Sequence, residues 1–170
     1  MENNEQTSLN WYALYTNSRA EKKVLELMVQ AGIEAYLPIK RELRQWSDRK
    51  KWVETPIINS YIFVRLHPDH LKTVYQINGV VAFVNSHGKP AVIPPKEIEA
   101  MQLTVNNQLA YTIEQHTLRK GETIRMVSGP LAGVEGEIVQ IKGQNKLYLK
   151  ISHIGFMMSV DVTSWEFVKV

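Results

Sequence analysis

The heptapeptide Ser60-Tyr61-Ile62-Phe63-Val64-Arg65-Leu66 carries the strongest strand signal in the chain. Its β-branched and aromatic residues fit the pleated, half-buried surface of a sheet, and we expect it to be a central strand. Trp11 to Thr16 has the same character and predicts a second strand. Further strands are expected at residues 33–39, where Pro38 interrupts the pattern, and at residues 80–84, before a turn at His87-Gly88.

Three helices are predicted beside these strands. Ser18-Arg19-Ala20-Glu21 spells a capping box, in which the hydroxyl and the carboxylate satisfy the free amides at a helix start. Apolar residues then recur at helical spacing up to Gly32, which can adopt the left-handed conformation that ends a helix. Pro68 and Pro94-Pro95 are placed to open the other two helices, because proline is tolerated in a first helical turn.

The pattern changes after about residue 118. Short β-rich segments separated by glycines follow at residues 123–128, 134–142, 146–151, 157–162 and 167–170. Strands at this spacing are typical of a small five-stranded β-barrel. We therefore expect an α+β protein in which an antiparallel sheet flanked by helices precedes a barrel. The predicted divisions are a flexible N-terminus at residues 1–8, a first domain at 9–109, a linker at 110–118 and the barrel at 119–170.

The composition excludes several classes of protein. The 170 residues are 44% apolar and 22% charged with a net charge of +3, which is typical of globular domains and not of disordered chains. The absence of cysteine excludes disulfides, thiol nucleophiles and thiolate metal ligands. No apolar run approaches the roughly 20 residues of a membrane span, and the polar start does not have the form of a signal peptide. We expect a cytoplasmic protein without membrane contact.

No arrangement of residues indicates catalysis. The five histidines do not fall into a catalytic or metal-ligand spacing, and the close pair His67 and His70 is interpreted as solvated surface groups. The glycine-rich run at 129–136 lacks the Gly-Lys-Ser/Thr ending of a phosphate loop, so we expect it to form turns. The sequence therefore predicts no enzyme activity, no metal and no cofactor.

A basic arm lies before the central strand. Residues 40–52 contain six Lys and Arg residues against two acidic residues, with Trp46 and Trp52 between them. Such an arm can neutralise phosphates and offer surfaces on which bases stack. The alternative, which composition alone favours, is a solvated loop whose tryptophans pack the arm onto itself. The candidate nucleic-acid contacts in the arm are Arg41, Arg44, Trp46, Arg49, Lys50 and Lys51.

Four motifs occur in a recognisable order. Trp11-Tyr12-Ala13-Leu14-Tyr15, the run from Thr55 to Val64, and Asn78-Gly79-Val80-Val81-Ala82-Phe83-Val84 together resemble the amino-terminal (NGN) domain of NusG-family transcription elongation factors. The run from Gly121 to Val139 is similar to the KOW motif that follows this domain in the family. The resemblance implies an NGN-like α+β domain followed by an SH3-like KOW barrel, and it implies a protein that is not an enzyme.

The resemblance also implies a polymerase-binding surface. Tyr15, Tyr61 and Phe63 match aromatic positions that contact the clamp helices in the largest subunit of RNA polymerase. Tyr61 and Phe63 share one face of their strand because side chains alternate. That face is either core or an exposed apolar patch. We favour the exposed patch, since Ile62 and Val64 can supply the core.

Further residues of this chain match, or lie near, single contact positions of the family. Asn17 and Lys23 match residues that touch upstream or non-template DNA, although Lys23 could equally be an ordinary solvated helix lysine. Lys72 and Thr73 lie near a motif that contacts the polymerase gate loop, and the match there is poor. Ile154 matches the apolar position through which some members bind a small-subunit ribosomal protein, and an apolar strand end would look the same.

One departure indicates the subtype. Housekeeping members usually have Pro-Gly before the tyrosine of the central strand, whereas this chain has Asn59-Ser60, which is similar to specialised paralogues of the RfaH and UpxY type. The resemblance thus implies a monomeric antitermination factor for particular long operons. The alternatives are a housekeeping NusG that couples polymerase to the ribosome and the termination factor, or a KOW-type RNA-binding or ribosome-binding protein.

Overall fold

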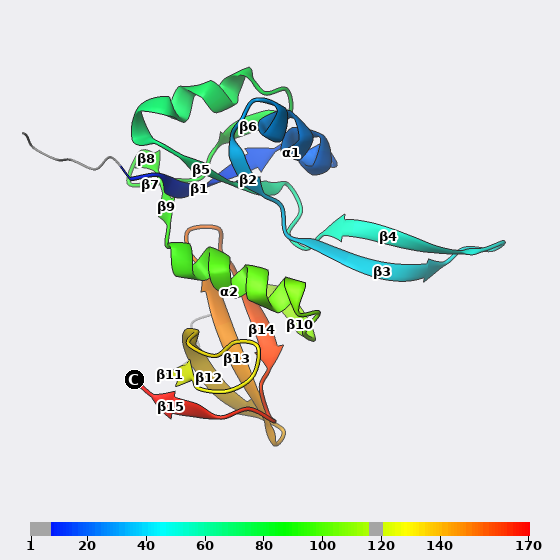
Figure 1. Ribbon diagram of the computed structural model, residues 1–170, viewed down its shortest axis with the longest axis vertical. Helices are drawn as coiled ribbons and strands as arrows, with labels where there is room; N and C mark the ends of the chain where they lie inside the picture. The colour runs from blue at the N-terminus through cyan, green and yellow to red at the C-terminus, as the bar shows by residue number, and fades with distance from the viewer. Residues whose placement is uncertain (1–7, 116–120) are drawn as a thin grey trace, which may run out of the picture. The chain divides into compact units, whose positions relative to one another are not determined.

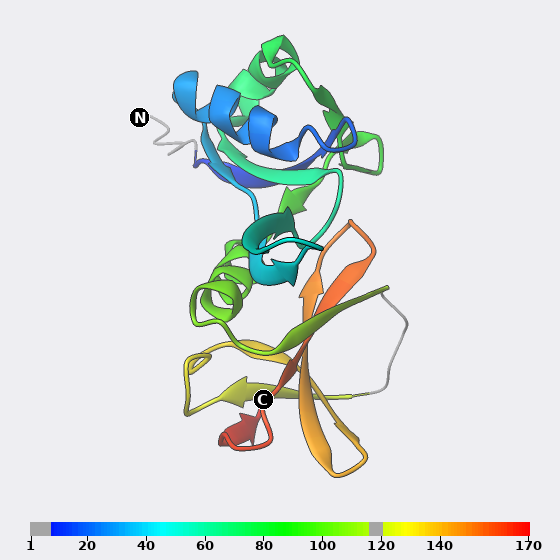
Figure 2. The ribbon, with the colours of Figure 1, turned by 90° about the vertical axis from the view of Figure 1, so that its right-hand side faces the viewer.

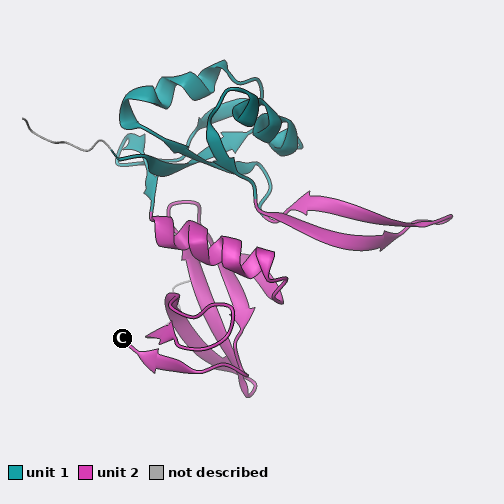
Figure 3. Ribbon diagram, in the orientation of Figure 1, with its two compact units in different colours: residues 1–37, 58–93 teal, residues 38–57, 94–170 magenta. Residues whose placement is uncertain are grey.

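The computed structural model describes residues 8–115 and 121–170. The chain divides into two compact units, of which unit 1 comprises residues 1–37 and 58–93 and unit 2 comprises residues 38–57 and 94–170 (Figure 3). The fold is the expected mixture of helices and antiparallel sheets. No helix within the described ranges is long and apolar enough to cross a membrane.

Unit 1 is built on a five-stranded antiparallel sheet (Figure 1). The strand order is β2 (Glu34–Tyr36), β5 (Tyr61–Leu66), β1 (Asn10–Thr16) and β6 (Val80–Phe83), and β9 (Val92–Ile93) pairs with the first part of β1. The central position predicted for β5 is confirmed, because β5 lies between β2 and β1. Both faces of this strand are apolar, and the side chains of Ile62, Phe63 and Val64 are fully buried.

Two helices pack on this sheet. The helix α1 (Glu21–Gln30) buries Val24 and Met28 and lies against β2 and β5. The 3₁₀ helix η1 (Pro68–Gln76) lies against β6, and Pro68 occupies its first turn as predicted. The short strands β7 (Asn85–Ser86) and β8 (Lys89–Pro90) form a hairpin around the predicted turn at His87-Gly88.

The predicted capping box at the start of α1 does not form. The N-cap is Ala20, no side chain caps the helix, and Arg19 has a positive φ of 63°. The carboxylate of Glu21 instead accepts a hydrogen bond of 2.7 Å from the backbone N–H of Ser60. This bond ties the first turn of α1 to the residue that precedes β5.

Unit 2 contains a six-stranded antiparallel sheet in the order β10 (Tyr111–Gln115), β14 (Phe156–Asp161), β13 (Gln144–Ile151), β12 (Glu135–Ile141), β11 (Glu122–Met126) and β15 (Phe167–Lys169). The last five strands in sequence are those predicted for the barrel. The strand β10 was not predicted: it lies in the stretch interpreted as a linker and pairs along its whole length with β14. Residues 116–118 of the predicted linker lie outside the described residues.

The helix α2 (Pro95–Asn106) packs on β13 within unit 2 (Figure 2). Two hydrogen bonds fix its first turn, because the carboxylate of Glu97 accepts from the backbone N–H of Ser152 at 2.7 Å and from its hydroxyl at 2.6 Å. The sequence pattern predicts this helix within the first domain, residues 9–109. In the structure it belongs to the same compact unit as the C-terminal sheet.

Pro38 marks the break in the predicted strand at 33–39. The chain leaves β2 at Tyr36 and begins a separate ribbon at Ile39, formed by β3 (Ile39–Gln45) and β4 (Lys50–Pro56). These two strands pair only with each other and contain most of the basic arm.

Candidate functional site: an aromatic pair and a basic hairpin

Tyr15 and Tyr61 form an aromatic pair across β1 and β5. They are partners in the strand register, and their ring centroids are 4.9 Å apart with the planes tilted by 45°. The side chain of Tyr15 is 39% exposed, and that of Tyr61 is half-buried. Burial, followed by a side-chain hydrogen bond with Tyr15, raises the pKa of Tyr61 to about 12. Tyr61 therefore stays neutral at physiological pH and presents an uncharged aromatic surface.

Phe63 does not join this pair at the surface. Its side chain is fully buried, and its ring stacks on Tyr36 of β2 with centroids 6.4 Å apart. The expected exposure of Phe63 is therefore wrong in this structure, although the alternation that places it on the face of Tyr61 is correct. Of the three predicted polymerase-binding aromatics, Tyr15 and Tyr61 are accessible.

Two further predicted contacts, Asn17 and Lys23, are exposed in unit 1. The Nζ atom of Lys23 lies 3.1 Å from the carboxylate of Glu26, one turn along α1. Exposed pairs of this kind contribute little to stability and leave the lysine able to exchange its partner for a phosphate. The structure thus keeps both interpretations of Lys23 open.

The two predicted polymerase contacts on η1 are also solvent-exposed. Lys72 and Thr73 both face solvent, and the Thr73 hydroxyl donates to the backbone carbonyl of His70 at 2.7 Å. His67, which was interpreted as a solvated group, caps η1 instead: its Nδ1 atom accepts from the backbone N–H of Asp69 at 3.2 Å. Its position directly before Pro68 is the sequence signal that could have identified it as a cap.

Ile154 lies in the turn between β13 and β14. Its side chain is only 6% exposed. The prediction of an accessible apolar contact at this position is therefore not met in this structure, and the burial agrees with the alternative of an apolar strand end. Binding of a partner through Ile154 stays a prediction.

The basic arm forms the β3–β4 hairpin (Figure 1). The strands pair from Ile39 opposite Pro56 to Gln45 opposite Lys50, and the turn is closed by a 2.8 Å bond from the Trp46 N–H to the Arg49 carbonyl. Because side chains alternate along a strand and register partners share a face, the hairpin has two distinct faces. We call them the Glu42 face, with Lys40, Glu42, Arg44 and Lys51, and the Trp52 face, with Arg41, Leu43, Lys50, Trp52 and Glu54.

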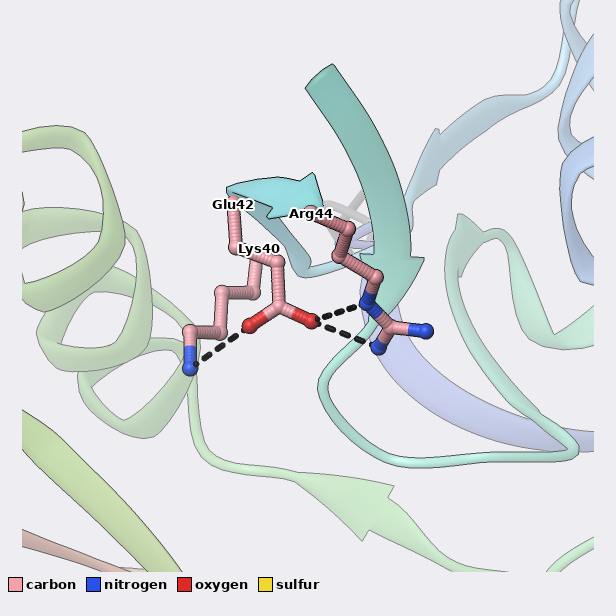
Figure 4. Close-up of polar contacts among 3 residues, drawn as sticks. All are labelled: Lys40, Glu42 and Arg44. Atoms are coloured by element: carbon pink, nitrogen blue, oxygen red, sulfur yellow. Dashed lines mark hydrogen bonds and ion pairs between the residues drawn. The ribbon is translucent and has the colours of Figure 1, made fainter. Parts of the chain in front are cut away.

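Ion pairs partly neutralise the Glu42 face. The Glu42 carboxylate lies 3.2 Å from the Lys40 Nζ atom and accepts a hydrogen bond of 2.8 Å from the Arg44 Nε atom (Figure 4). Arg44, and after it Lys40, hold the pKa of Glu42 below its usual value. Glu42 is therefore ionised at neutral pH and offsets part of the charge of the two cations.

The Trp52 face and the tip of the hairpin expose aromatic rings, unlike the Glu42 face. Trp46 and Trp52 are each 56% exposed, so the alternative in which the tryptophans pack the arm onto itself is wrong. The Arg41 guanidinium carbon lies 5.0 Å from the centroid of the Trp52 ring, within cation–π distance. Among the described residues, Arg49 at the tip and Lys50 on the Trp52 face form no ion pair, and neither does Lys51 on the Glu42 face. This part of the hairpin combines available cations with exposed aromatic rings.

Comparison with known proteins decides the family. The family model described as transcription termination factor nusG matches residues 9–102, which include the aromatic pair and the hairpin. The chain belongs to the NusG family. NusG proteins named transcription termination/antitermination protein resemble it over most of their length: that of Thermus thermophilus is 24% identical over 95% of this chain and 99% of its own. That of Rickettsia bellii is 23% identical over 89% and 84%.

A solved structure of NusG from Thermotoga maritima shows the same fold. It covers 95% of this chain and 97% of its own with a TM-score of 0.53, at 21% sequence identity. Within residues 8–115 and 121–170, no group of three or more His, Asp or Glu residues could hold a metal ion.

Proposed function

We propose that this protein is a transcription elongation factor that binds RNA polymerase and suppresses pausing or termination. The observation that carries the proposal is the NusG-family match over residues 9–102, within which Tyr15 and Tyr61 form an accessible aromatic pair. The names of the relatives from Thermus thermophilus and Rickettsia bellii, which include termination and antitermination, support the same process. The proposed polymerase element is the pair of clamp helices in the largest subunit.

The proposed mechanism is mechanical and requires no catalytic residue. An uncharged aromatic surface can bury apolar area against a helical partner, and the Tyr15–Tyr61 pair offers such a surface. If the factor binds the closed clamp more tightly than the open clamp, its binding shifts the population toward the closed, forward-translocating polymerase. Lys72 and Thr73 on η1 are the proposed second contact with the polymerase.

The hairpin is the proposed nucleic-acid contact, on upstream or non-template DNA. Arg49, Lys50 and Lys51 supply cations that have no ion pair within the described part of the chain, and Arg41, Arg44 and Trp46 complete the predicted set. Asn17 and Lys23 in unit 1 are proposed to touch the same nucleic acid. Binding by these residues releases condensed counterions, so the contact weakens as salt is raised.

Specialised action on particular long operons is the finer form of the proposal. It is supported by Asn59-Ser60 in place of the Pro-Gly of housekeeping members. The housekeeping role fits the family match equally well, and genome-wide occupancy against occupancy of a few operons separates the two. We also propose that the protein is a cytoplasmic monomer. Its C-terminal domain is proposed to recruit a small-subunit ribosomal protein through Ile154. This contact requires the buried side chain of Ile154 to become accessible.

Transcription in vitro tests the proposed function. Purified polymerase is allowed to elongate on a template with a pause site and an intrinsic terminator, with and without the protein. We expect higher read-through with the wild-type protein and a loss of this effect in the Tyr15→Ala/Tyr61→Ala double variant. Val29→Ala truncates an exposed residue on α1 and serves as the control. No change in pausing or read-through with the wild type would contradict the proposal.

A further inference from the structure

We propose that the β3–β4 hairpin binds single-stranded nucleic acid by stacking bases on Trp46 and Trp52, and that a cavity beside Trp52 receives one base. The inference rests on the nucleic-acid contact in the proposed function and assigns its chemical class. It depends on three observations: two exposed indoles, an uneven distribution of available charge, and a cavity with an unpartnered hydroxyl.

The hairpin exposes two indole rings, those of Trp46 and Trp52. Trp46 lies at the tip and Trp52 lies on β4, and each is 56% exposed. Trp52 is opposite Leu43, three residues before Trp46, so the two aromatics are about 10 Å apart along the ribbon at ~3.3 Å per residue. Exposure of large apolar rings to water is unfavourable unless a partner covers them, and the π-face of any base is a suitable partner.

The cations of the hairpin differ in whether a carboxylate engages them. On the Glu42 face, Glu42 engages Lys40 and Arg44, and only Lys51 is without an ion pair among the described residues. Arg49 and Lys50, which lie beside the two indoles, also have no ion pair within the described ranges. Arg41 lies over the Trp52 ring and continues this row of cations toward the root of the hairpin, where the acidic Glu54 is its register partner. Phosphates bound along this row would hold their bases next to the tryptophans.

A cavity lies beside Trp52. A hollow of about 500 Å³ lies where the hairpin root meets the end of α2, lined among others by Arg41, Trp52, Val105, Gln108, Leu109 and Tyr111. This volume is within the range of small-ligand sites. The Tyr111 hydroxyl is buried without a hydrogen-bond partner in the described structure. The hydroxyl is covered in this structure, so a bound base reaches it only when the cavity lining shifts, and the ring nitrogens and exocyclic groups of the base can then satisfy it.

These features together favour a single strand over a duplex. In a duplex the faces of the bases are stacked on one another, so the indoles would find only phosphates and the cavity would stay empty. In a single strand both the phosphates and the base faces are available. DNA and RNA single strands share this chemistry, and the experiment distinguishes them.

The test uses the full-length protein with short fluorescein-labelled oligo(dT), oligo(U) and a duplex of equal length. Fluorescence anisotropy gives the affinities, and quenching of tryptophan fluorescence reports stacking directly. We expect the single strands to bind at least about fivefold tighter than the duplex, and Trp52→Ala to weaken their binding by about fivefold or more. Trp52→Phe should restore most of the affinity. Tyr111→Phe, which removes only the hydroxyl, should weaken binding of the single strand and not of the duplex.

Tyr75→Ala is the matched control, because Tyr75 is 55% exposed but lies on η1 in unit 1. It should bind the oligonucleotides like the wild type. Equal affinity of the wild type for duplex and single strand would overturn the inference, as would unchanged binding by Trp46→Ala and Trp52→Ala. A protein that binds core polymerase and the duplex but no single strand overturns this inference alone, whereas one that binds oligo(dT) but not polymerase contradicts only the proposed polymerase binding.

Discussion

The carboxylate of Glu21 and the backbone N–H of Ser60 are joined by a 2.7 Å hydrogen bond across 39 residues of sequence. The Glu21 side chain is 4% exposed, and Ser60 has a φ of 64°. The bond therefore fixes the start of α1 against the turn that leads into β5, the central strand of unit 1. Tyr61, one of the two accessible aromatics, directly follows that turn.

Glu21→Ala should lower the free energy of unfolding by about 1–3 kcal/mol, because it leaves a part-buried backbone N–H without its acceptor. Urea denaturation measures the change. Glu26→Ala is the control on the same helix: it removes an exposed carboxylate whose one ion pair in the described structure is with Lys23, so its effect should stay within about 0.5 kcal/mol. Equal losses in the two variants would show that the bond to Ser60 contributes nothing specific.

Gly129→Ala should destabilise the C-terminal domain more than Gly143→Ala. Both glycines have a positive φ, of 77° and 79°, so both variants carry the same backbone strain. Only at Gly129 would the new Cβ meet a side chain, at 2.7 Å from the Trp165 ring, whereas nothing lies within 4 Å at Gly143. The expected difference is about 1–3 kcal/mol of unfolding free energy, and a smaller loss at Gly129 would contradict the described contact.

Tyr61 should make stability depend on pH in the alkaline range. Its pKa is raised from 10.0 to about 12 in the folded protein by burial and by Tyr15. Between these values the unfolded chain loses the Tyr61 proton while the folded protein keeps it, so this contribution is complete below pH 10 and is lost as pH rises toward about 12. Urea denaturation across this range should show a steeper loss for the wild type than for Tyr61→Phe. Parallel curves would contradict the shift.

The two faces of the hairpin should differ in the salt dependence of nucleic-acid binding. Each phosphate contact to a single strand contributes about 0.7 to the slope of log K against log salt. Lys50→Gln should reduce the slope by about this amount, because Lys50 has no ion pair among the described residues. Lys40→Gln should reduce it less, since Glu42 already offsets the charge of Lys40. If Lys40→Gln reduced the slope more than Lys50→Gln, the Glu42 face and not the Trp52 face would be the one that contacts phosphates.

Much of the fold was predictable because local pattern and final structure agree. The run of β-branched and aromatic residues at 61–66 predicts β5, and short β-rich segments between glycines predict the five strands from β11 to β15. The strand β10 was missed because Tyr111–Gln115 is short and without clear alternation. It is held by pairing with β14, more than 40 residues later, which no local pattern reveals.

The capping box failed for a similar reason. Ser18 and Glu21 have the right spacing for a capping box. The carboxylate of Glu21, however, accepts its hydrogen bond from the backbone N–H of Ser60 and not from an N–H at the start of its own helix. Ser60, in the turn before β5, has a positive φ of 64°, a conformation that glycine adopts without steric cost.

The site was predictable only in part. Alternation correctly placed Tyr61 and Phe63 on one face, but it could not show that Phe63 would be covered and stacked on Tyr36, since that depends on the order of strands in the sheet. Composition identified the basic arm. The division of its charges between two faces required the register of β3 with β4, which the sequence does not contain.

Binding to purified core RNA polymerase without nucleic acid tests the central claim most directly. The wild type, the Tyr15→Ala/Tyr61→Ala double variant and Trp46→Ala are compared by biolayer interferometry after circular dichroism has confirmed their folding. We expect tight binding by the wild type and by Trp46→Ala, whose hairpin has no nucleic acid to contact, and at least about a tenfold loss in the double variant. Binding that is absent in the wild type, or unchanged in the folded double variant, would contradict the account.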